Sequence, residues 1–274
     1  MPELPEVETI TNALNYAILG QSFLEINIFF PKLRYDLTLQ NEEKLLNQKI
    51  IKIYRRARYT IIELENKHAI TLHYGMTGSV RICDPKDKRR KHEHVCFELS
   101  NGQSLRFEDP RRFGHISHCK LTTPHALPPE LSELGIEPLT DEFTGRYLFT
   151  QFKTRRTPIK TAIMENKIVV GVGNIYANES LFASKINPQA KANEISSKKL
   201  NLLVKNIKVI LKQAIAAGGT TIADFKGLNG QEGKFDINLK VYGRTNEQCF
   251  TCKTPIQKIK QAGRSTFLCP KCQK

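Results

Sequence analysis

Four cysteines near the carboxyl end constrain this chain more than any other feature of its sequence. Cys249, Cys252, Cys269 and Cys272 follow the pattern C-x2-C-x16-C-x2-C. Each C-x2-C pair offers two sulfur atoms to one tetrahedral ion, an arrangement typical of a four-thiolate zinc site. Two disulfides are the alternative, and they disagree with the reducing compartment that we expect. We therefore predict one structural Zn²⁺ in a small hairpin, and no organic cofactor.

Length and composition indicate more than one structural part. At 274 residues the chain exceeds the roughly 250 residues at which a single core usually stops growing. No apolar run approaches the roughly 20 residues that a membrane helix needs, and the amino-terminal residues lack the order of a secretion signal. We therefore expect a cytoplasmic protein without a membrane partner.

The charge balance indicates a polyanionic partner. Lysine and arginine total 42 against 27 aspartate and glutamate residues, a formal charge of +15 with a pI near 9.5. Such a balance favours a nucleic-acid-binding protein, although a ribosomal or merely soluble basic protein also shows it. The basic residues gather at 86–92, 153–160 and 253–274. We interpret these clusters as local patches rather than one disordered tail.

The hydrophobic pattern changes along the chain. Apolar residues recur at helical spacing over 3–18, whereas 22–120 holds short alternating runs such as FLEINIFF and TIIELEN, which predict an antiparallel sandwich or barrel. The Pro-rich stretch at 124–130 is the predicted linker. A helical part follows, clearest over 196–217. For 220–238, which lacks periodicity, we predict a mobile lid or capping loop.

The first residues carry an unusual candidate nucleophile. Removal of Met1 before the small Pro2 exposes a secondary amine, and an α-amine has a reference pKa of roughly 7.7 to 8.0. A neutral secondary amine can attack a sugar C1′ and form an iminium without any lysine. Glu3 adjoins this amine and can move protons for it, whereas for Glu8 we favour the role of a carboxylate at a helix start.

Two further motifs suit a protein that handles DNA. In IVVGVGNIYANES, two glycines precede a predicted helix with Asn174 at its N-cap, a typical phosphate-binding arrangement, although a structural tight turn explains the glycines equally well. In EDPRRFG, an arginine and an aromatic side chain at a loop tip suit an enzyme that everts a base, although a phosphate-binding arginine beside a core phenylalanine explains the motif as well. Met76, between glycines, is a second candidate wedge.

Together these motifs resemble the formamidopyrimidine-DNA glycosylase family, bacterial enzymes that repair oxidised purines. The similarity runs nearly from end to end, through PELPEVE, HYGMTGSVRI, KHEHVCFELSNG, DPRRFG, VVGVGNIYANESLF, GGTT and VYGR to the four cysteines. The PELPEV opening favours this family over its relative endonuclease VIII, which prefers oxidised pyrimidines.

The resemblance implies an α+β fold in three parts. Residues 1–125 are expected to form the catalytic domain, an antiparallel β-sandwich with a leading helix. A helical helix-two-turn-helix domain that binds DNA is expected over 126–225. The remainder of the capping loop and a β-hairpin zinc finger are expected over 226–274.

The resemblance also implies roles for individual residues. Pro2 attacks C1′ of the damaged nucleotide, Glu3 donates a proton, and Arg264 contacts a phosphate and assists the final elimination. The residues implied to contact DNA are His92, Arg111, Arg156, His73, Lys160, Asn174 and Tyr242. The residues implied to fill the gap left by the everted base are Met76, Arg111 and Phe113.

One position departs from the family pattern. In RRARYTI, Arg58 stands where the family usually has a lysine with a role in β-elimination. Arginine keeps the charge but scarcely releases a proton near neutral pH. We therefore expect strand nicking to be slower relative to base removal, or Glu3 and water to carry the proton transfers.

The predicted function is a bifunctional glycosylase and abasic-site lyase of base excision repair. It excises 8-oxoguanine and formamidopyrimidines from double-stranded DNA and cleaves the strand by β,δ-elimination, as a monomer associated with the bacterial nucleoid. Two alternatives stay open at this point, an endonuclease VIII-like enzyme for oxidised pyrimidines and a zinc-ribbon DNA-binding protein without catalysis. The second leaves the Pro2-Glu3 terminus unexplained.

Overall fold

The chain forms two compact units. The computed structural model describes residues 2–35, 37, 39, 42–219 and 239–274. The first unit comprises the described residues up to Ser132 together with Gly218 and Gly219, and the second comprises Glu133–Ala217 and the described residues from 239 onward. The three-part division that we drew from the sequence stays a prediction, and the lid or capping loop predicted over 220–238 lies outside the described residues.

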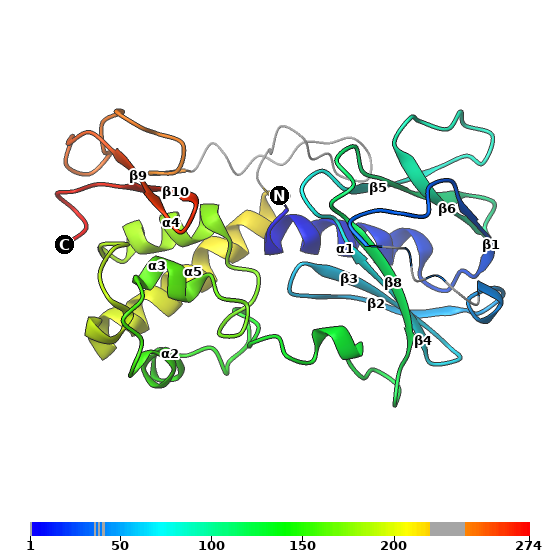
Figure 1. Ribbon diagram of the computed structural model, residues 1–274, viewed down its shortest axis with the longest axis horizontal. Coiled ribbons are helices and arrows are strands. Elements are labelled where there is room, and N and C mark those ends of the chain that lie inside the picture. The colour runs from blue at the N-terminus through cyan, green and yellow to red at the C-terminus, as the bar shows by residue number, and fades with distance from the viewer. Residues whose placement is uncertain (1, 36, 38, 40–41, 220–238) are drawn as a thin grey trace. The chain divides into compact units, whose positions relative to one another are not determined.

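Two four-stranded antiparallel sheets build the first unit (Figure 1). Their strand orders are β1-β6-β7-β5 and β2-β3-β4-β8. The strands are β1 (Phe23–Ile28), β2 (Ile50–Arg56), β3 (Tyr59–Leu64), β4 (His68–His73), β5 (Ser79–Cys83), β6 (Glu93–Leu99), β7 (Ser104–Glu108) and β8 (His115–Lys120), and η1 (Glu42–Lys44) and η2 (Pro129–Leu131) are short 3₁₀ turns. The predicted antiparallel sandwich is confirmed.

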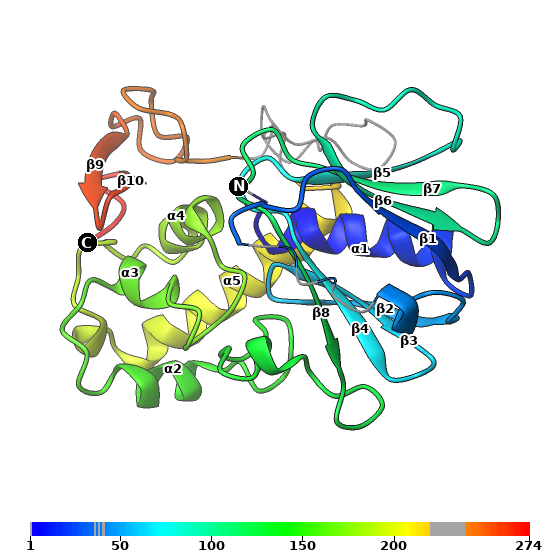
Figure 2. The ribbon, with the colours of Figure 1, turned by 45° about the vertical axis from the view of Figure 1, so that its right-hand side comes forward.

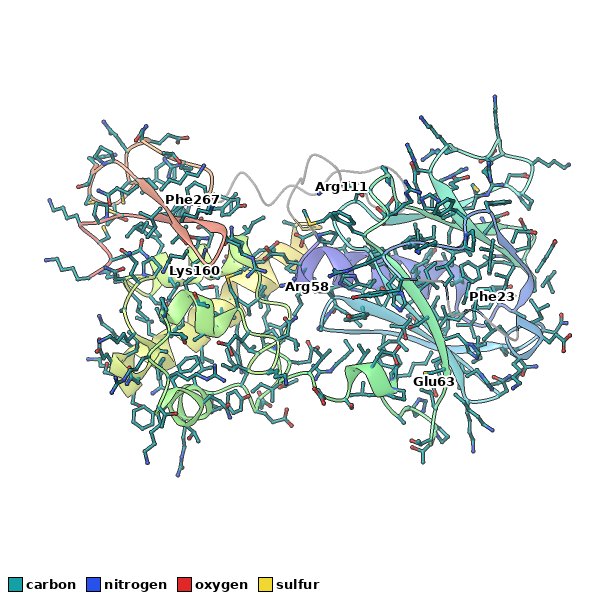
Figure 3. All side chains as sticks on the ribbon, in the orientation of Figure 1. Phe23, Arg58, Glu63, Arg111, Lys160 and Phe267 are labelled. Carbon is teal, nitrogen blue, oxygen red and sulfur yellow. The ribbon has the colours of Figure 1, made fainter. Side chains whose placement is uncertain are left out.

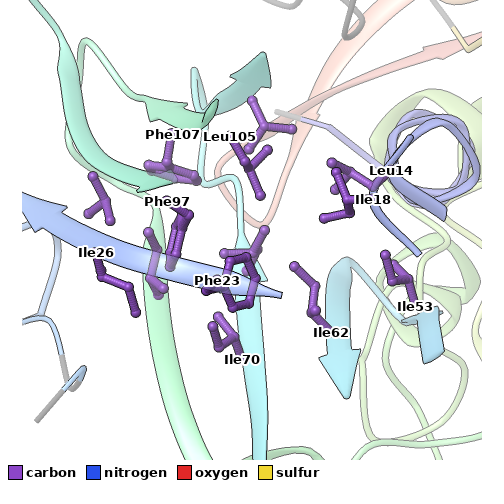
Figure 4. Close-up of a cluster of buried hydrophobic side chains, with 14 of the residues drawn as sticks. Leu14, Ile18, Phe23, Ile26, Ile53, Ile62, Ile70, Phe97, Leu105 and Phe107 are labelled. Carbon is purple, nitrogen blue, oxygen red and sulfur yellow. The ribbon is translucent and has the colours of Figure 1, made fainter. Parts of the chain in front are cut away.

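Helix α1 (Leu4–Ile18) packs against the hydrophobic core that the two sheets share. Its apolar residues recur every three or four positions, so that Val7, Ile10, Leu14 and Ile18 face inward. They pack with side chains of both sheets in one buried cluster (Figure 4). Because this cluster anchors almost the whole length of α1, the residues at its amino end are held on a rigid element.

Four helices and a hairpin build the second unit (Figure 2). The elements are α2 (Gly145–Phe152), α3 (Ile159–Ile163), α4 (Asn174–Ala183), the 3₁₀ turn η3 (Ala192–Glu194), α5 (Ser197–Ala216), β9 (Gln257–Gln261) and β10 (Arg264–Leu268). The long helix predicted over 196–217 is confirmed, and the Ser196 side chain caps it by accepting from the Lys199 amide at 3.4 Å. Within the described residues, no helix is both long and apolar enough to cross a bilayer.

The predicted cap of α4 is wrong by one residue. Gly173 is the N-cap, and Asn174 is the first residue inside the helix. The Asn174 side chain does not cap its own helix; its amide donates to the carbonyl oxygen of Ser265 in β10 at 3.0 Å. A tertiary partner therefore outcompetes the local capping interaction that the sequence pattern favours.

Candidate functional site

The amino end of α1 is a buried, capped helix start. Pro2 is buried, Glu3 is 4% exposed, and Glu6 is fully buried. The Glu3 backbone N–H donates to Glu6 Oε2 at 2.8 Å, and the two residues form a reciprocal capping box. The Pro2-Glu3 pair is therefore held in a fixed backbone conformation at the rim of the first unit.

A chain of hydroxyl groups fastens α1 to the second sheet. Tyr74 Oη donates to Thr60 Oγ1 at 2.9 Å, and Thr60 Oγ1 lies 2.7 Å from Thr11 Oγ1, which itself donates to the Val7 carbonyl. Each hydroxyl has one proton, so Tyr74 donates to Thr60, Thr60 donates to Thr11, and Thr11 donates to the Val7 carbonyl. Because each member is buried, breaking the chain leaves an unpaired polar group.

A second link joins α1 to strand β2. Arg55 Nε lies 2.5 Å from Glu8 Oε2, and the arginine side chain is only 8% exposed. Glu8 is thus an ion-pair partner, and its carboxylate has a tertiary role besides the helix-start role that we favoured from the sequence.

Gly219 lies directly against the same helix start. A Cβ atom at this position would stand 2.9 Å from Glu6 Cγ, and the backbone φ of +85° favours glycine. The second glycine of the GGTT motif is therefore required by close packing on a buried carboxylate.

Arg58 and His73 are neighbours at one end of the second sheet (Figure 3 labels Arg58). Arg58 follows the left-handed Ala57 in the β2–β3 turn, and His73 ends β4 opposite Tyr59. Burial lowers the pKa of His73 to about 4, and the positive charge of Arg58 is the next largest cause. His73 is therefore neutral at neutral pH and can offer a phosphate a hydrogen bond rather than a charge.

The structure brings the two predicted wedge loops together. A Cβ on Gly75 would stand 2.3 Å from the Phe113 backbone, so the loop that carries Met76 packs on the loop of the DPRRFG motif. Met76 is half-buried, Arg111 is exposed, and Phe113 is 43% exposed. The Arg111 guanidinium lies 4.8 Å above the centre of the Phe113 ring. These three side chains thus belong to one loop cluster.

Asp109 holds this loop cluster in place. The residue is fully buried, and its carboxylate accepts from Thr77 Oγ1 at 2.5 Å and from the Gly114 amide at 2.6 Å. Its backbone amide donates to the carbonyl oxygen of His92 at 3.0 Å, which ties the half-buried His92 to the same cluster. Asp109 therefore links three loops, two through its carboxylate and the loop of His92 through its backbone amide.

Lys160 and Asn174 meet beneath the hairpin in the second unit (Figure 3). The Lys160 side chain is 2% exposed, and its Nζ donates to Asn174 Oδ1 at 2.6 Å, to Thr266 Oγ1 at 2.7 Å and to the Ser265 carbonyl at 3.1 Å. Three acceptors match the three protons of the ammonium group. These contacts make Lys160 a support for Asn174 and β10, and its phosphate contact stays a prediction.

Glu179 organises the backbone that precedes the hairpin. It is 4% exposed and accepts from the amides of Lys240, Val241 and Tyr242 at 2.8–2.9 Å. Burial raises the pKa of Glu179, while the three donors oppose that shift. The ring of Tyr242 packs edge to face on Phe267 with centroids 4.9 Å apart. Two contacts therefore hold Tyr242 in place: the hydrogen bond of its backbone amide to Glu179 and the packing of its ring on Phe267.

Two arginines of the second unit that we expect to contact DNA are exposed. Arg156 lies in the exposed segment between α2 and α3. Arg264 is exposed at the first position of β10, directly after Ala262 and Gly263, which both have positive φ. This two-residue turn is of the kind that matches the twist of a hairpin. The DNA contacts expected of Arg156 and Arg264 stay predictions.

The four cysteines form one cluster at the end of the hairpin. Their ligand atoms all lie within 4.8 Å of one another, with Sγ–Sγ distances of 4.0 Å for Cys249–Cys272 and 3.3 Å for Cys252–Cys269. A tetrahedral zinc with Zn–S bonds of about 2.3 Å requires sulfur atoms about 3.8 Å apart. The cluster therefore fits one structural Zn²⁺, and four thiolates leave no coordination position for water.

The sequence analysis did not identify three carboxylates that support the predicted site residues. Glu6, Asp109 and Glu179 are buried, and each accepts backbone amide protons near predicted site residues. All three lie inside the motifs of the sequence, but their partners do not follow from it, because each partner is set by the folding of the backbone.

Comparison with known families identifies the chain. The model of the formamidopyrimidine-DNA glycosylase N-terminal domain matches residues 1–116, that of the formamidopyrimidine-DNA glycosylase H2TH domain matches 134–226, and that of the zinc finger found in FPG and IleRS matches 247–274. The chain belongs to the formamidopyrimidine-DNA glycosylase family. Members are DNA glycosylases with lyase activity at abasic sites, so this glycosylase is an enzyme, and the alternative of a non-catalytic zinc-ribbon protein is wrong.

Relatives of this glycosylase match it over its full length. The formamidopyrimidine-DNA glycosylase of Vibrio parahaemolyticus is 44% identical and that of Rickettsia conorii 43% identical, and the matches cover 100% of this chain and 99–100% of the relatives. Among solved structures, a Lactococcus lactis FPG mutant with Fapy-dG-containing DNA and the same organism's Fpg with abasic-site DNA each align with a TM-score of 0.90 over both whole chains, at 35% and 34% identity. The predicted α+β fold, with its H2TH domain and zinc finger, is confirmed.

Proposed function

We propose that this glycosylase excises oxidised purines, 8-oxoguanine and formamidopyrimidines, from duplex DNA and then cleaves the strand at the resulting abasic site. The observation that carries the proposal is the Pro2-Glu3 pair at a buried, capped helix start in a chain of this family. Similar proteins were solved with Fapy-dG and abasic-site DNA, which supports the substrate class. DNA is the partner, and we further propose a monomer in the bacterial cytoplasm, associated with the nucleoid.

The chemistry begins with the free secondary amine of Pro2. Its nitrogen lone pair forms a bond to C1′ as the glycosidic bond breaks. The departing base takes the electron pair of that bond and the N–H proton that the proline nitrogen gives up. Glu3 donates the proton that opens the sugar ring. As the ring C–O bond breaks, the nitrogen lone pair forms a double bond to C1′. The product is a charged iminium rather than a neutral imine, because the nitrogen then has no N–H proton left to lose.

Strand cleavage follows from the same iminium. The cation acidifies the C2′ proton, and transfer of this proton to the Glu3 carboxylate or to water expels the 3′ phosphate by β-elimination. A second elimination, with loss of the C4′ proton to the same acceptors, expels the 5′ phosphate. Arg264 contacts a phosphate and assists this final step. Eversion of the base costs a few kcal/mol, which the Met76, Arg111 and Phe113 cluster and the phosphate contacts offset. Zinc takes no part beyond holding the hairpin that carries Arg264.

The proposal is tested with defined lesions. We expect the protein to release 8-oxoguanine and to nick the strand without added magnesium, because no step needs a metal-bound water. Oligonucleotides that contain thymine glycol should react more slowly. Faster reaction of thymine glycol would instead assign the endonuclease VIII-like specificity.

Arg58 offers a second test of the same mechanism. Replacement Arg58→Lys supplies a group that can release a proton, so we expect strand cleavage to accelerate relative to base removal by roughly tenfold or more. Base release and nicking are measured separately on one labelled duplex. The control is Arg56→Lys, the same change at the end of β2; an unchanged ratio in Arg58→Lys would reject the role given to this position.

A further inference from the structure

The first unit carries a cationic hollow beside His92 that the proposed mechanism does not use. The hollow has a volume of about 250 Å³, and its lining includes Phe29, Phe30, Arg89, His92, Glu93 and Arg112. The hollow lies between the segment that follows β1, the β5–β6 loop and the DPRRFG loop. The basic cluster at 86–92, of which only His92 has a role so far, forms one of its sides.

Two arginines of this hollow are stacked on aromatic rings. The Arg89 guanidinium lies 4.5 Å from the centre of the Phe29 ring, and the Arg112 guanidinium lies 4.8 Å from the centre of the Phe30 ring. Stacking occupies the flat face of a guanidinium and leaves the N–H donors at its edge available. A planar group held in this way is already oriented for bidentate contact with a phosphate.

Neighbouring arginines differ in having acidic partners. Arg81 and Arg106 pair with Glu93, and Arg90 pairs with Glu108 at 3.5 Å. Among the residues that the structure describes, neither Arg89 nor Arg112 has an ion pair or a side-chain hydrogen bond. Glu93 and Glu108 thus pair with other arginines. No neighbouring carboxylate of the described residues offsets the positive charges of Arg89 and Arg112.

Glu93, the one carboxylate among the described residues that line the hollow, is already neutralised. The Glu93 side chain is fully buried, and it accepts from Arg81 Nε at 2.5 Å and from the Arg90 amide at 2.9 Å. It therefore does not compete with an anion for Arg89 or Arg112. The hollow as a whole favours a negatively charged occupant.

We propose that this hollow binds a backbone phosphate of the substrate duplex through Arg89 and Arg112, adjacent to the phosphate contacted by His92. The inference rests on the proposed function, because His92 continues the DNA-binding surface into the hollow. Phe29 and Phe30 act as platforms that orient the guanidinium groups. The contact reads no sequence and extends the footprint of the enzyme along the duplex.

The test is the salt dependence of DNA binding. Dissociation constants for a duplex with a stable abasic-site analogue are measured over a series of KCl concentrations. Each lost phosphate contact makes the slope of log K against log salt shallower by about 0.9. If the variant and the unmodified enzyme bind equally at 1 M salt, the variant then binds about eightfold more weakly at 0.1 M salt. We expect this change in Arg89→Ala, and a larger one when Arg112→Ala is added.

Two control variants sharpen the result. Arg90→Ala removes the same charge from the same loop, but Arg90 is paired with Glu108, so its slope should stay close to that of the unmodified enzyme. Phe29→Tyr keeps a ring under Arg89 and should bind normally, whereas Phe29→Leu should weaken binding. Equal slopes in Arg89→Ala and the unmodified enzyme, or equal losses in Arg89→Ala and Arg90→Ala, would overturn the inference.

Borohydride trapping separates this inference from the proposed function. At saturating protein, Arg89→Ala should be trapped on lesion DNA as completely as the unmodified enzyme. If the unmodified enzyme is not trapped, the proposed function fails. If it is trapped and the slope does not change, only the inference about the hollow fails.

Discussion

One alanine inserted ahead of Pro2 is expected to abolish covalent trapping on lesion DNA. The insertion turns the proline nitrogen into a tertiary amide, which has no available lone pair for attack on C1′. Base release should fall by roughly 10³-fold or more, as is usual when a nucleophile is lost. The measurement is borohydride trapping on 8-oxoguanine DNA, followed by single-turnover base release.

The insertion needs controls because Pro2 is buried. One alanine added after Lys274 makes the same change in mass and should leave trapping intact. Binding of a duplex with an abasic-site analogue reports whether the inserted protein still folds around DNA. Peptide mapping of trapped material should place the adduct on residue 2. Full turnover by protein that retains Met1 would contradict the mechanism.

Replacement Cys249→Ala is expected to remove the zinc and most DNA affinity together. The hairpin part has a small core, in which Val241, Ile256 and Phe267 are the buried residues besides cysteine. So few apolar side chains do not stabilise a fold of this size alone, whereas structural zinc sites contribute about 10–16 kcal/mol of apparent binding free energy. The loss should therefore unfold the hairpin.

Unfolding of the hairpin has a consequence inside the helical part. Two of the three Lys160 acceptors described above belong to β10, and the Phe267 amide donates to Asn178 Oδ1 at 2.7 Å. Without β10, a buried ammonium group and a buried amide lose their partners, which is costly. Asn174 and Arg264 then lose their positions at the same time.

Metal content and DNA affinity are measured on the same preparation. We expect zinc to fall from one equivalent to none in Cys249→Ala. Cys119→Ala is the matched control, because Cys119 is a half-buried thiol of β8 outside the cluster; it should keep both zinc and affinity. Tight DNA binding by zinc-free Cys249→Ala would show that the hairpin folds without the metal.

Much of the fold was predictable because local patterns report burial. Alternating apolar residues identified the strands, and the spacing of Val7, Ile10 and Leu14 identified α1. Four closely spaced thiols identified the zinc site, since metal ligation depends on residue type and spacing more than on the surrounding fold. The order of strands in the two sheets was not predictable, because several antiparallel orders satisfy the same alternation.

The residue types alone show which chemical groups this glycosylase carries: a proline and a glutamate directly after Met1, a zinc-binding set of thiols, and a surplus of arginine and lysine. Which of these charged groups have partners depends on tertiary contacts. Lys160 is buried against β10, and Arg90 is paired with an acid, whereas Arg89 is stacked on an aromatic ring. The reason is physical: a side chain's partners are set by the packing of segments far apart in the chain, and local sequence does not encode those distances.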